Sequence, residues 1–522
     1  MNVLKIILAM ILMICSVVAQ KASTLPDNIN SYINRVMQEF DIPGISIALV
    51  KEGQILLTRG YGLRQLGESI PVDAATLFGI ASNTKAFTAT ALALLVEEGK
   101  LQWDQPVIDY LPWFQMSDPY VTREMTIRDL LVHRSGLGLG AGDLLWWPAS
   151  TYNREEIIQR LKFIPLITSF RSTYAYDNVL YAVAGEVIKA ISGQSWEDFV
   201  ATRILSPVGM VTSNVRHSAS SSGSNVATPH ARIEGIVKPV KPFISDNVNP
   251  AGGINSNAED MAKWMIVQLD SGRLVDGSRL FSPKTTRELW NPVTPMPNSP
   301  LPPELSPAQY NFKAYALGFV VQDYRGHKLI THTGGLPGYL SRVSMIPDLK
   351  LGIAILTNQE SSAAFNSIAH HVLDYYLYAQ PYDWIDAYKK ISERWRSRLK
   401  ALYQAARVSR DSTSNPSLPL EKYAGRYRDA WYGDIMIKLQ NEGLVIQFEH
   451  TPDLVGAMEH WQYDTFVARW YDRSLRGDAF VTFALNPDGS IDQVKLKPFS
   501  KAVDFSFDYQ DLLLKPVQEE SP

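Results

Sequence analysis

The chain has 522 residues, of which 46% are hydrophobic and 20% are charged, and its formal net charge is -3. This composition is typical of folded globular domains, and 50 Lys plus Arg against 53 Asp plus Glu leave no basic excess to bind nucleic acid. A single cysteine excludes disulfide frameworks, zinc ribbons and C-x-x-C redox sites, because each of these needs at least two thiols.

The first residues are typical of a secretory signal peptide. Lys5 precedes an apolar run over residues 6–18, and Ala19 provides a small residue at the cleavage position. The run is shorter than the roughly 20 apolar residues that a membrane span needs. We therefore expect residues 1–19, which include the lone Cys15, to be removed, and the mature protein to be secreted or periplasmic with no stable membrane span.

Strand patterns stand at both ends of the next region, with helical patterns between them. The sequence ISIALVKEGQILLTRGYG from Ile45 predicts a hairpin, and strand signals return over residues 316–335 and 339–359. This order predicts an α+β domain in which one antiparallel sheet is assembled from distant parts of the chain. Helices flank the sheet, and a mostly helical region is inserted between its strands.

A change of pattern marks a second domain. After a charged helix from about Trp384, short alternating runs such as DIMIKLQ and FVTFAL continue from Leu420, separated by turns. Strands at this spacing over about 100 residues predict a small β-barrel-like domain. We expect a first domain over residues 20–382, a charged helix and linker over residues 383–418, and a β-rich module over residues 419–522.

The letters SNTK from Ser82 to Lys85 form an S-x-x-K sequence at the start of an Ala- and Leu-rich helix. Three residues along a helix bring the Lys85 amine over the same face as the Ser82 hydroxyl, so a desolvated, neutral amine can activate this hydroxyl. The helix N-terminus favours negative charge that develops on a substrate oxygen. A second match from Ser397 to Lys400 lies in the charged helix, so the pattern alone also fits a capping serine with a surface lysine.

Two further patterns follow along the chain. Tyr176, Asp177 and Asn178 form a Y-x-N sequence on a loop that leads into a helix. A phenol beside an ammonium can accept and donate a proton, and an amide can hold a substrate carbonyl. The sequence HTGG from His332 to Gly335 ends a strand-like run, and its glycine pair lets a substrate approach closely and leaves an N–H free to point at an oxyanion.

In the order S-x-x-K, Y-x-N and H-T-G, these sequences resemble the serine β-lactamase and penicillin-binding protein superfamily, most closely its class C-like branch. The sequences TIRDLLVHRSGL, ILSPVGM, NPAGGINSNAEDMAKW and HTGGLPGY extend the resemblance over residues 30–378. The tail from Leu420 resembles a lipocalin-like β module found after some of these hydrolases. The resemblance implies a serine hydrolase for amide or ester bonds, with D-amino-acid or peptidoglycan-like peptides preferred to β-lactams as substrates, and no cofactor or metal.

The resemblance implies three catalytic residues. Ser82 is the acylated nucleophile and Lys85 is its proton partner. Tyr176 passes the proton to the leaving group and activates the water that hydrolyses the acyl-enzyme. Which group is the base during acylation is disputed within this superfamily.

Substrate binding is implied for Asn178, His332, Thr333, Gly334 and Gly335. The resemblance places Asn178 on the substrate amide and the N–H groups of Ser82 and Gly335 in an oxyanion hole. His332 and Thr333 bind a substrate carboxylate or line its site. Many members carry lysine in place of His332, and a neutral imidazole binds a carboxylate less firmly than an ammonium, so penicillin-like substrates are less expected.

Several alternatives stay open. The letters GLGLGA from Gly136 to Ala141 fit a dinucleotide fingerprint without the strand that should precede it. His370, His371 and Asp374 fit either packing or a metal site. The alternative function is a non-catalytic secreted binding or matrix protein that keeps this fold. The β module can serve as an adhesive or can shape the mouth of the active site, and oligomeric state is left open.

Overall fold

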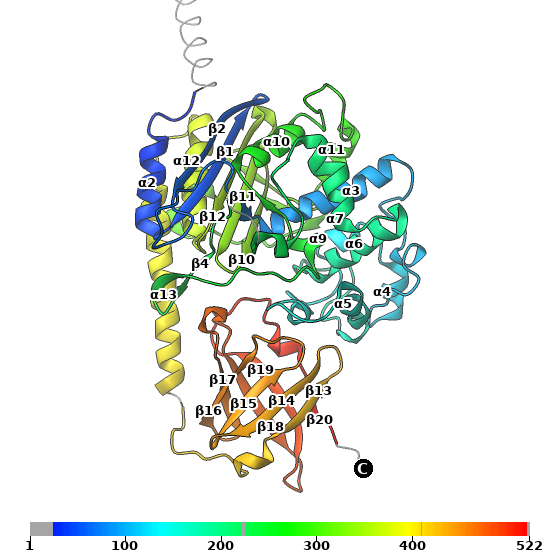
Figure 1. Ribbon diagram of the computed structural model, residues 1–522, viewed down its shortest axis with the longest axis vertical. Coiled ribbons are helices and arrows are strands. Elements are labelled where there is room, and N and C mark those ends of the chain that lie inside the picture. The colour runs from blue at the N-terminus through cyan, green and yellow to red at the C-terminus, as the bar shows by residue number, and fades with distance from the viewer. Residues whose placement is uncertain (1–23, 222–224, 409, 519–522) are drawn as a thin grey trace, which may run out of the picture.

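The structure, a computed structural model, describes residues 24–221, 225–408 and 410–518. The predicted signal peptide lies outside these residues. Figure 1 shows a sheet with helices on both of its faces and, beside it, a barrel-shaped sheet formed by the C-terminal part of the chain. No helix among the described residues is both long and apolar enough to cross a membrane.

The first domain is built on an eight-stranded sheet with the order β2-β1-β12-β11-β10-β9-β8-β7. β1 pairs antiparallel with both β2 and β12, so Ile45 lies opposite Thr357 from far along the chain. This arrangement confirms the predicted sheet. Its strands are β1 (Gly44–Lys51), β2 (Gln54–Gly62), β7 (Thr294–Pro295), β8 (Lys313–Tyr315), β9 (Val320–Tyr324), β10 (His327–Leu336), β11 (Tyr339–Ile346) and β12 (Leu351–Thr357).

Alternation along β1, which lies between β2 and β12, divides its side chains between two apolar cores. Ile45, Ile47 and Leu49 join one apolar cluster, whereas Ala48 and Val50 join the other. Both faces are covered, so every residue of β1 is buried. The first face is covered by α2 (Ile29–Phe40), α12 (Ser362–Tyr376) and the first part of α13 (Trp384–Val408).

The helical region covers the other face. Within it, α3 (Thr84–Glu97) is buried on all sides from Thr84 to Leu95, because its sequence is Ala-, Thr- and Leu-rich all round. Phe87 of α3 stacks on Trp264 with ring centroids 3.9 Å apart. The other helices are α4 (Pro119–Glu124), α5 (Arg154–Arg160), α6 (Val179–Ser192), α7 (Trp196–Val200), α8 (Ser206–Val208), α9 (Asn249–Gly252), α10 (Ala258–Leu269) and α11 (Pro283–Leu289).

The C-terminal module is a nearly closed antiparallel barrel. Its order is β19-β18-β17-β16-β15-β14-β13-β20, and Val494 and Leu514 exchange backbone hydrogen bonds of 2.9 and 3.1 Å that join its two ends. These two bonds leave fewer unpaired backbone groups at the two edges of the sheet. Its strands are β13 (Gly425–Asp429), β14 (Gly433–Gln440), β15 (Gly443–Phe448), β16 (Val455–Gln462), β17 (Thr465–Trp470), β18 (Ala479–Leu485), β19 (Ile491–Pro498) and β20 (Lys515–Pro516).

The barrel contacts the helical region of the first domain directly. The Thr151 N–H donates to the His450 carbonyl at 2.8 Å, and Arg160 Nη1 donates to the Trp431 carbonyl at 2.9 Å. One apolar cluster runs from α3 through the inserted helices into the barrel. The two domains therefore share a packed interface rather than only a linker.

Candidate active site

Ser82 lies on a tight turn between a short strand and a helix. β3 (Phe78–Gly79) leads into a 3-10 turn over Ala81–Asn83, and α3 follows. The buried Ala81 has a φ of 50°, a left-handed value that is uncommon for residues other than glycine. The turn places Ser82 at the N-terminal end of α3, where backbone N–H groups favour negative charge.

Glycine in β10 allows that strand to approach the turn closely. A Cβ on Gly334 would lie 2.2 Å from the Ile80 carbonyl oxygen and 2.6 Å from the Ser341 hydroxyl oxygen, so a side chain would force the strand away. Thr333 and Gly335 alternate with Gly334 and line the same cavity as Ser82. The two predicted oxyanion-hole residues therefore lie around one cavity.

Lys85 contacts Ser82 from the first turn of α3. Its Nζ donates to Ser82 Oγ at 3.0 Å, to Asn178 Oδ1 at 2.8 Å and to the Ala251 carbonyl at 2.9 Å. The side chain is 0% exposed. Burial lowers the pKa of Lys85 from 10.5 to about 7, and the carboxyls of Asp143 and Asp177 oppose only part of this change. A substantial fraction of the amine is therefore neutral near pH 7 and able to accept the Ser82 proton.

Tyr176 lies on the loop before α6 and faces the same lysine. Lys85 Nζ is 4.9 Å from the centroid of the Tyr176 ring. The phenol oxygen is buried, and it has no hydrogen-bond partner among the described residues. Burial raises the pKa of Tyr176 well above 10, and the nearby Ser82 hydroxyl offsets only part of the rise. The phenol therefore carries its proton at neutral pH.

Asn178 is held between Lys85 and a buried carboxyl group. Its Oδ1 accepts from Lys85, and its Nδ2 donates to Asp143 Oδ2 at 2.8 Å. Asp143 also accepts a 2.9 Å bond from Trp146 Nε1, and burial raises its pKa to about 7. One amide N–H of Asn178 is left for a substrate carbonyl. Sequence reasoning missed Asp143, because it follows the glycine-rich run without belonging to a recognised motif.

His332 lines the cavity, but both of its ring nitrogens are already bonded within the protein. Nδ1 lies 2.6 Å from the Thr333 carbonyl oxygen and Nε2 lies 2.8 Å from Tyr315 Oη. A carbonyl can only accept, so Nδ1 carries the proton and Nε2 accepts from the phenol. Burial and the Lys85 charge lower the pKa of His332 to about 3. This neutral ring fits a lining role and does not fit direct binding of a substrate carboxylate.

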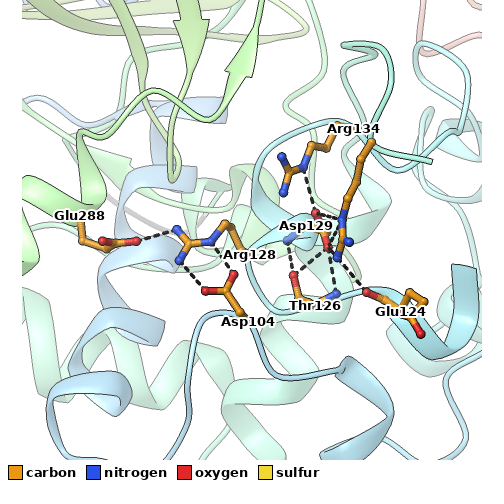
Figure 2. Close-up of polar contacts among 8 residues, drawn as sticks. Asp104, Glu124, Thr126, Arg128, Asp129, Arg134 and Glu288 are labelled. Atoms are coloured by element: carbon orange, nitrogen blue, oxygen red, sulfur yellow. Dashed lines mark hydrogen bonds and ion pairs between the residues drawn. The ribbon is translucent and has the colours of Figure 1, made fainter. Parts of the chain in front are cut away.

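A buried carboxylate, Asp129, supports the segment that leads to Tyr176, and Figure 2 shows Asp129 bonded to Thr126 and Arg134. Asp129 is 0% exposed and accepts hydrogen bonds from Arg134 Nε at 2.9 Å and Arg171 Nη2 at 2.6 Å. The Arg171 N–H also donates to the Arg134 carbonyl at 2.8 Å, which ties the two segments together. The sequence TIRDLLVHRSGL therefore contributes to this site by holding the Tyr176 loop in place.

A cavity of about 1360 Å³ opens over Ser82 between the two domains. This volume exceeds the range of about 300–1,000 Å³ that is common for small-molecule pockets, so the cavity can admit an extended substrate. The first domain contributes aromatic walls from Trp146, Trp147 and Phe243. The β module contributes to another wall, with Pro452, Asp453, Arg476, Asp504, Phe505 and Ser506 among its lining residues. The module thus shapes the mouth of the site.

The remaining sequence patterns have structural explanations. The run from Gly136 to Ala141 forms a loop beside Tyr176 and does not follow a strand as a dinucleotide fingerprint would. Asp374 is bonded to Arg325 Nε at 2.7 Å and to Trp384 Nε1 at 2.9 Å, and the ring of His370 packs among aromatic residues. The described parts of the chain bring together no group of three or more His, Cys, Asp or Glu suited to a metal ion.

The domain that holds this site matches a known protein family. Residues 29–377 match the Beta-lactamase family. The chain belongs to the Beta-lactamase family. This is a serine hydrolase family of the β-lactamase and penicillin-binding protein type, as the three motifs predicted. Residues 409–516 match a second family, described as a domain of unknown function (DUF3471), which covers the β module.

Two relatives that are matched over most of their length carry hydrolase names. An unguisins hydrolase, ungD', of Aspergillus campestris is 30% identical over 430 residues, which cover 78% of this chain and 77% of the relative. The unguisins hydrolase ungD of Aspergillus violaceofuscus is 28% identical and is matched over 85% of its length and 88% of this chain.

Solved structures share the β-lactamase-like fold. The octameric penicillin-binding protein homologue from Pyrococcus abyssi aligns with a TM-score of 0.58 and 21% identity, over 94% of this chain and 99% of that chain. The D-amino acid amidase from Ochrobactrum anthropi SV3 aligns with a TM-score of 0.55 and 22% identity, over 66% of this chain and 98% of that chain.

Proposed function

We propose that this chain is an exported serine hydrolase that forms an acyl-enzyme on Ser82 and cleaves amide or ester bonds in D-amino-acid or peptidoglycan-like peptides. The observation that carries this proposal is the buried Lys85 amine, 3.0 Å from Ser82 Oγ, with its pKa lowered to about 7. Perturbed amines beside a hydroxyl are typical of activated nucleophiles. Export rests on the leader pattern of residues 1–19.

The geometry suggests an order of proton transfers. Ser82 Oγ bonds to the substrate carbonyl carbon while its proton moves to neutral Lys85, and the oxyanion is met by the N–H groups of Ser82 and Gly335. The protonated Tyr176 gives its proton to the leaving nitrogen or oxygen as the scissile bond breaks, and it is then reprotonated from Lys85. Water, activated by the same pair of residues, hydrolyses the acyl-enzyme and restores the Ser82 hydroxyl.

The substrate class is supported by the cavity and by the relatives. The cavity of about 1360 Å³ is large enough for several residues of a peptide. The name of the unguisins hydrolase points to hydrolysis, and the name of the D-amino acid amidase points to amide substrates with D-configured amino acids. His332 is neutral and supplies no fixed cation for the carboxylate of a penicillin, which favours peptides and esters over β-lactams.

A non-catalytic binding protein is the weaker alternative. Burying an amine costs folding free energy unless its partners compensate, and a purely structural descendant has no need to keep Lys85 in contact with Ser82 and Asn178. These contacts favour catalysis.

A labelling experiment and a substrate panel test this proposal. We expect a fluorophosphonate probe to add its phosphonyl group to Ser82 of the full-length protein, detected by mass spectrometry of the modified peptide. D-amino-acid anilides and short-chain esters should be hydrolysed faster than nitrocefin. An unlabelled Ser82 together with no turnover across the panel would overturn the proposed function, whereas nitrocefin as the best substrate would overturn the substrate class.

The pH dependence of the reaction should report the state of Lys85. Only the neutral amine accepts the Ser82 proton, so we expect kcat/KM to rise with pH through about 7, where an ordinary lysine at 10.5 would give a much later rise. The titratable groups whose charges interact with Lys85 are Asp143, Asp177, His133 and His332. The profile is measured with an ester whose leaving group does not titrate in this range. A rise centred near 10 would contradict the assigned role.

A further inference from the structure

A segment of the β module reaches the catalytic centre from outside the β-lactamase-like domain. Ser506 and Asp508 are 5% and 0% exposed, although the barrel strands β13 to β19 separate them in the sequence from the hydrolase domain. The ring of Phe505, just before them, lies with its centroid 6.1 Å from that of Tyr176. The segment is therefore packed against the site and buried there.

Ser506 is connected to Lys85 through two side chains. Its hydroxyl donates to Asp143 Oδ2 at 2.8 Å, and the same oxygen accepts from Asn178 Nδ2 at 2.8 Å. Asn178 Oδ1 in turn accepts from Lys85 Nζ at 2.8 Å. All of these groups are buried, and in such surroundings hydrogen bonds are strong and a lost partner is costly.

Asp508 holds the backbone on either side of Asp143. Its two carboxyl oxygens accept from the N–H of Gly142 at 2.6 Å and from the N–H of Leu144 at 3.2 Å. These two bonds flank the residue whose side chain contacts Asn178. The backbone and the side chain of Asp143 are thus both fixed from the β module.

The glycine-rich run beside Tyr176 makes room for this contact. Gly140 has a φ of 71°, and a Cβ there would lie 2.8 Å from the Phe505 carbonyl oxygen. The Gly140 N–H also donates to the Tyr176 carbonyl at 2.9 Å. The run that resembled a dinucleotide fingerprint therefore serves as the surface on which the module segment docks.

We propose that Ser506 and Asp508 of the β module are positioning residues of the active site, which fix Asp143 so that Asn178 and Lys85 keep their geometry at Ser82. This inference rests on the proposed function, because it concerns the same catalytic lysine. It gives the C-terminal module a part in the reaction itself, beyond forming a wall of the cavity.

The central test uses the full-length chain with Ser506→Ala. Small displacements of a catalytic group commonly cost up to about 100-fold in rate, so we expect kcat to fall about 10- to 100-fold while KM changes less. Ser506→Thr keeps the hydroxyl and should restore most of the rate. Asp508→Asn keeps only one good acceptor for the two N–H groups and should lower kcat in the same direction. Ser490→Ala is the matched control, since that hydroxyl bonds to Asp488 within an exposed turn of the module.

The pH profile separates positioning from a general loss of structure. The Ser506 hydrogen bond lowers the pKa of Asp143, and the Asp143 charge raises that of Lys85. Losing this bond leaves Asp143 less ionised, so the rise of kcat/KM should move to lower pH in Ser506→Ala. Circular dichroism and thermal unfolding check that each variant is folded.

The outcomes distinguish this inference from the proposed function. A wild-type protein that does not label at Ser82 overturns both. A wild-type protein that labels, with a Ser506→Ala variant that keeps its kcat and its pH profile, overturns only the positioning role. A crystal structure of Ser506→Ala adds a readout apart from activity: Asn178 should move relative to Lys85, and unchanged positions would contradict the inference.

Discussion

Replacing Ser82 with alanine should abolish covalent labelling and lower kcat/KM by about 10⁴-fold or more, the scale seen when a nucleophile is removed from a serine hydrolase. The loss is expected to be this large because, once the Ser82 hydroxyl is gone, neither Lys85 nor Tyr176 replaces it as the nucleophile that takes up the acyl group. Initial rates with the best ester or anilide of the panel, together with mass spectrometry of the probe-treated protein, measure both effects.

The chain provides a matched control in its second S-x-x-K sequence. Ser397 and Lys400 lie exposed on α13. Ser397→Ala therefore removes a serine hydroxyl from an equivalent S-x-x-K sequence that does not line the cavity. This variant should keep wild-type activity. Labelling that persists in Ser82→Ala, or that disappears in Ser397→Ala, would reject Ser82 as the nucleophile.

Replacing Lys85 with methionine should lower kcat by about 10²- to 10⁴-fold, the usual range for an acid–base group. Methionine approximates the length and packing of the lysine side chain while removing the amine that accepts the Ser82 proton. The change removes the desolvation cost of the charged amine but leaves Asn178 Oδ1 and the Ala251 carbonyl without their donor, so thermal unfolding is measured to show that the variant is folded. The rate of labelling by the fluorophosphonate probe isolates the attack by Ser82 Oγ from the later steps of turnover.

Four observations decide how the result is interpreted. Lys400→Met on α13 serves as the control and should leave kcat unchanged. The rise of kcat/KM that comes from Lys85 should disappear in Lys85→Met, since the amine that accepts the Ser82 proton is gone, even though Asp143 still titrates near 7. Wild-type turnover in this variant would refute Lys85 as the proton acceptor, and wild-type turnover in Tyr176→Phe would refute the role of the phenol.

Much of the fold could be predicted because its signals are local. Alternation in ISIALVKEGQILLTRGYG predicted the β1–β2 hairpin, and the turn-separated alternating runs after Leu420 predicted the barrel. Ser82 and Lys85 are three residues apart, so helix geometry alone brought the two side chains together. The family resemblance rested on the same short sequences, and the family match over residues 29–377 agrees with it.

The chemical state of the site depends on contacts that local sequence does not encode. The pKa shift of Lys85 arises because the fold buries its amine beside Asn178, which lies 93 residues further along the chain. From the sequence, His332 is a possible carboxylate ligand, but in the fold Tyr315 at the end of β8, two strands away in the sheet, occupies its Nε2. Burial and partner choice set these pKa values, and both are properties of the packed structure.

The sequence by itself determined the family, the nucleophile candidate and the presence of a β-rich module. Only the tertiary structure decided that the pKa of Lys85 is about 7, that His332 is neutral, and that Ser506 donates a hydrogen bond to Asp143 across 363 residues of sequence. The physical reason is the separation in sequence over which each effect acts. Helix and strand periodicity act between residues a few positions apart, whereas desolvation and long-range hydrogen bonds arise only when distant segments pack together.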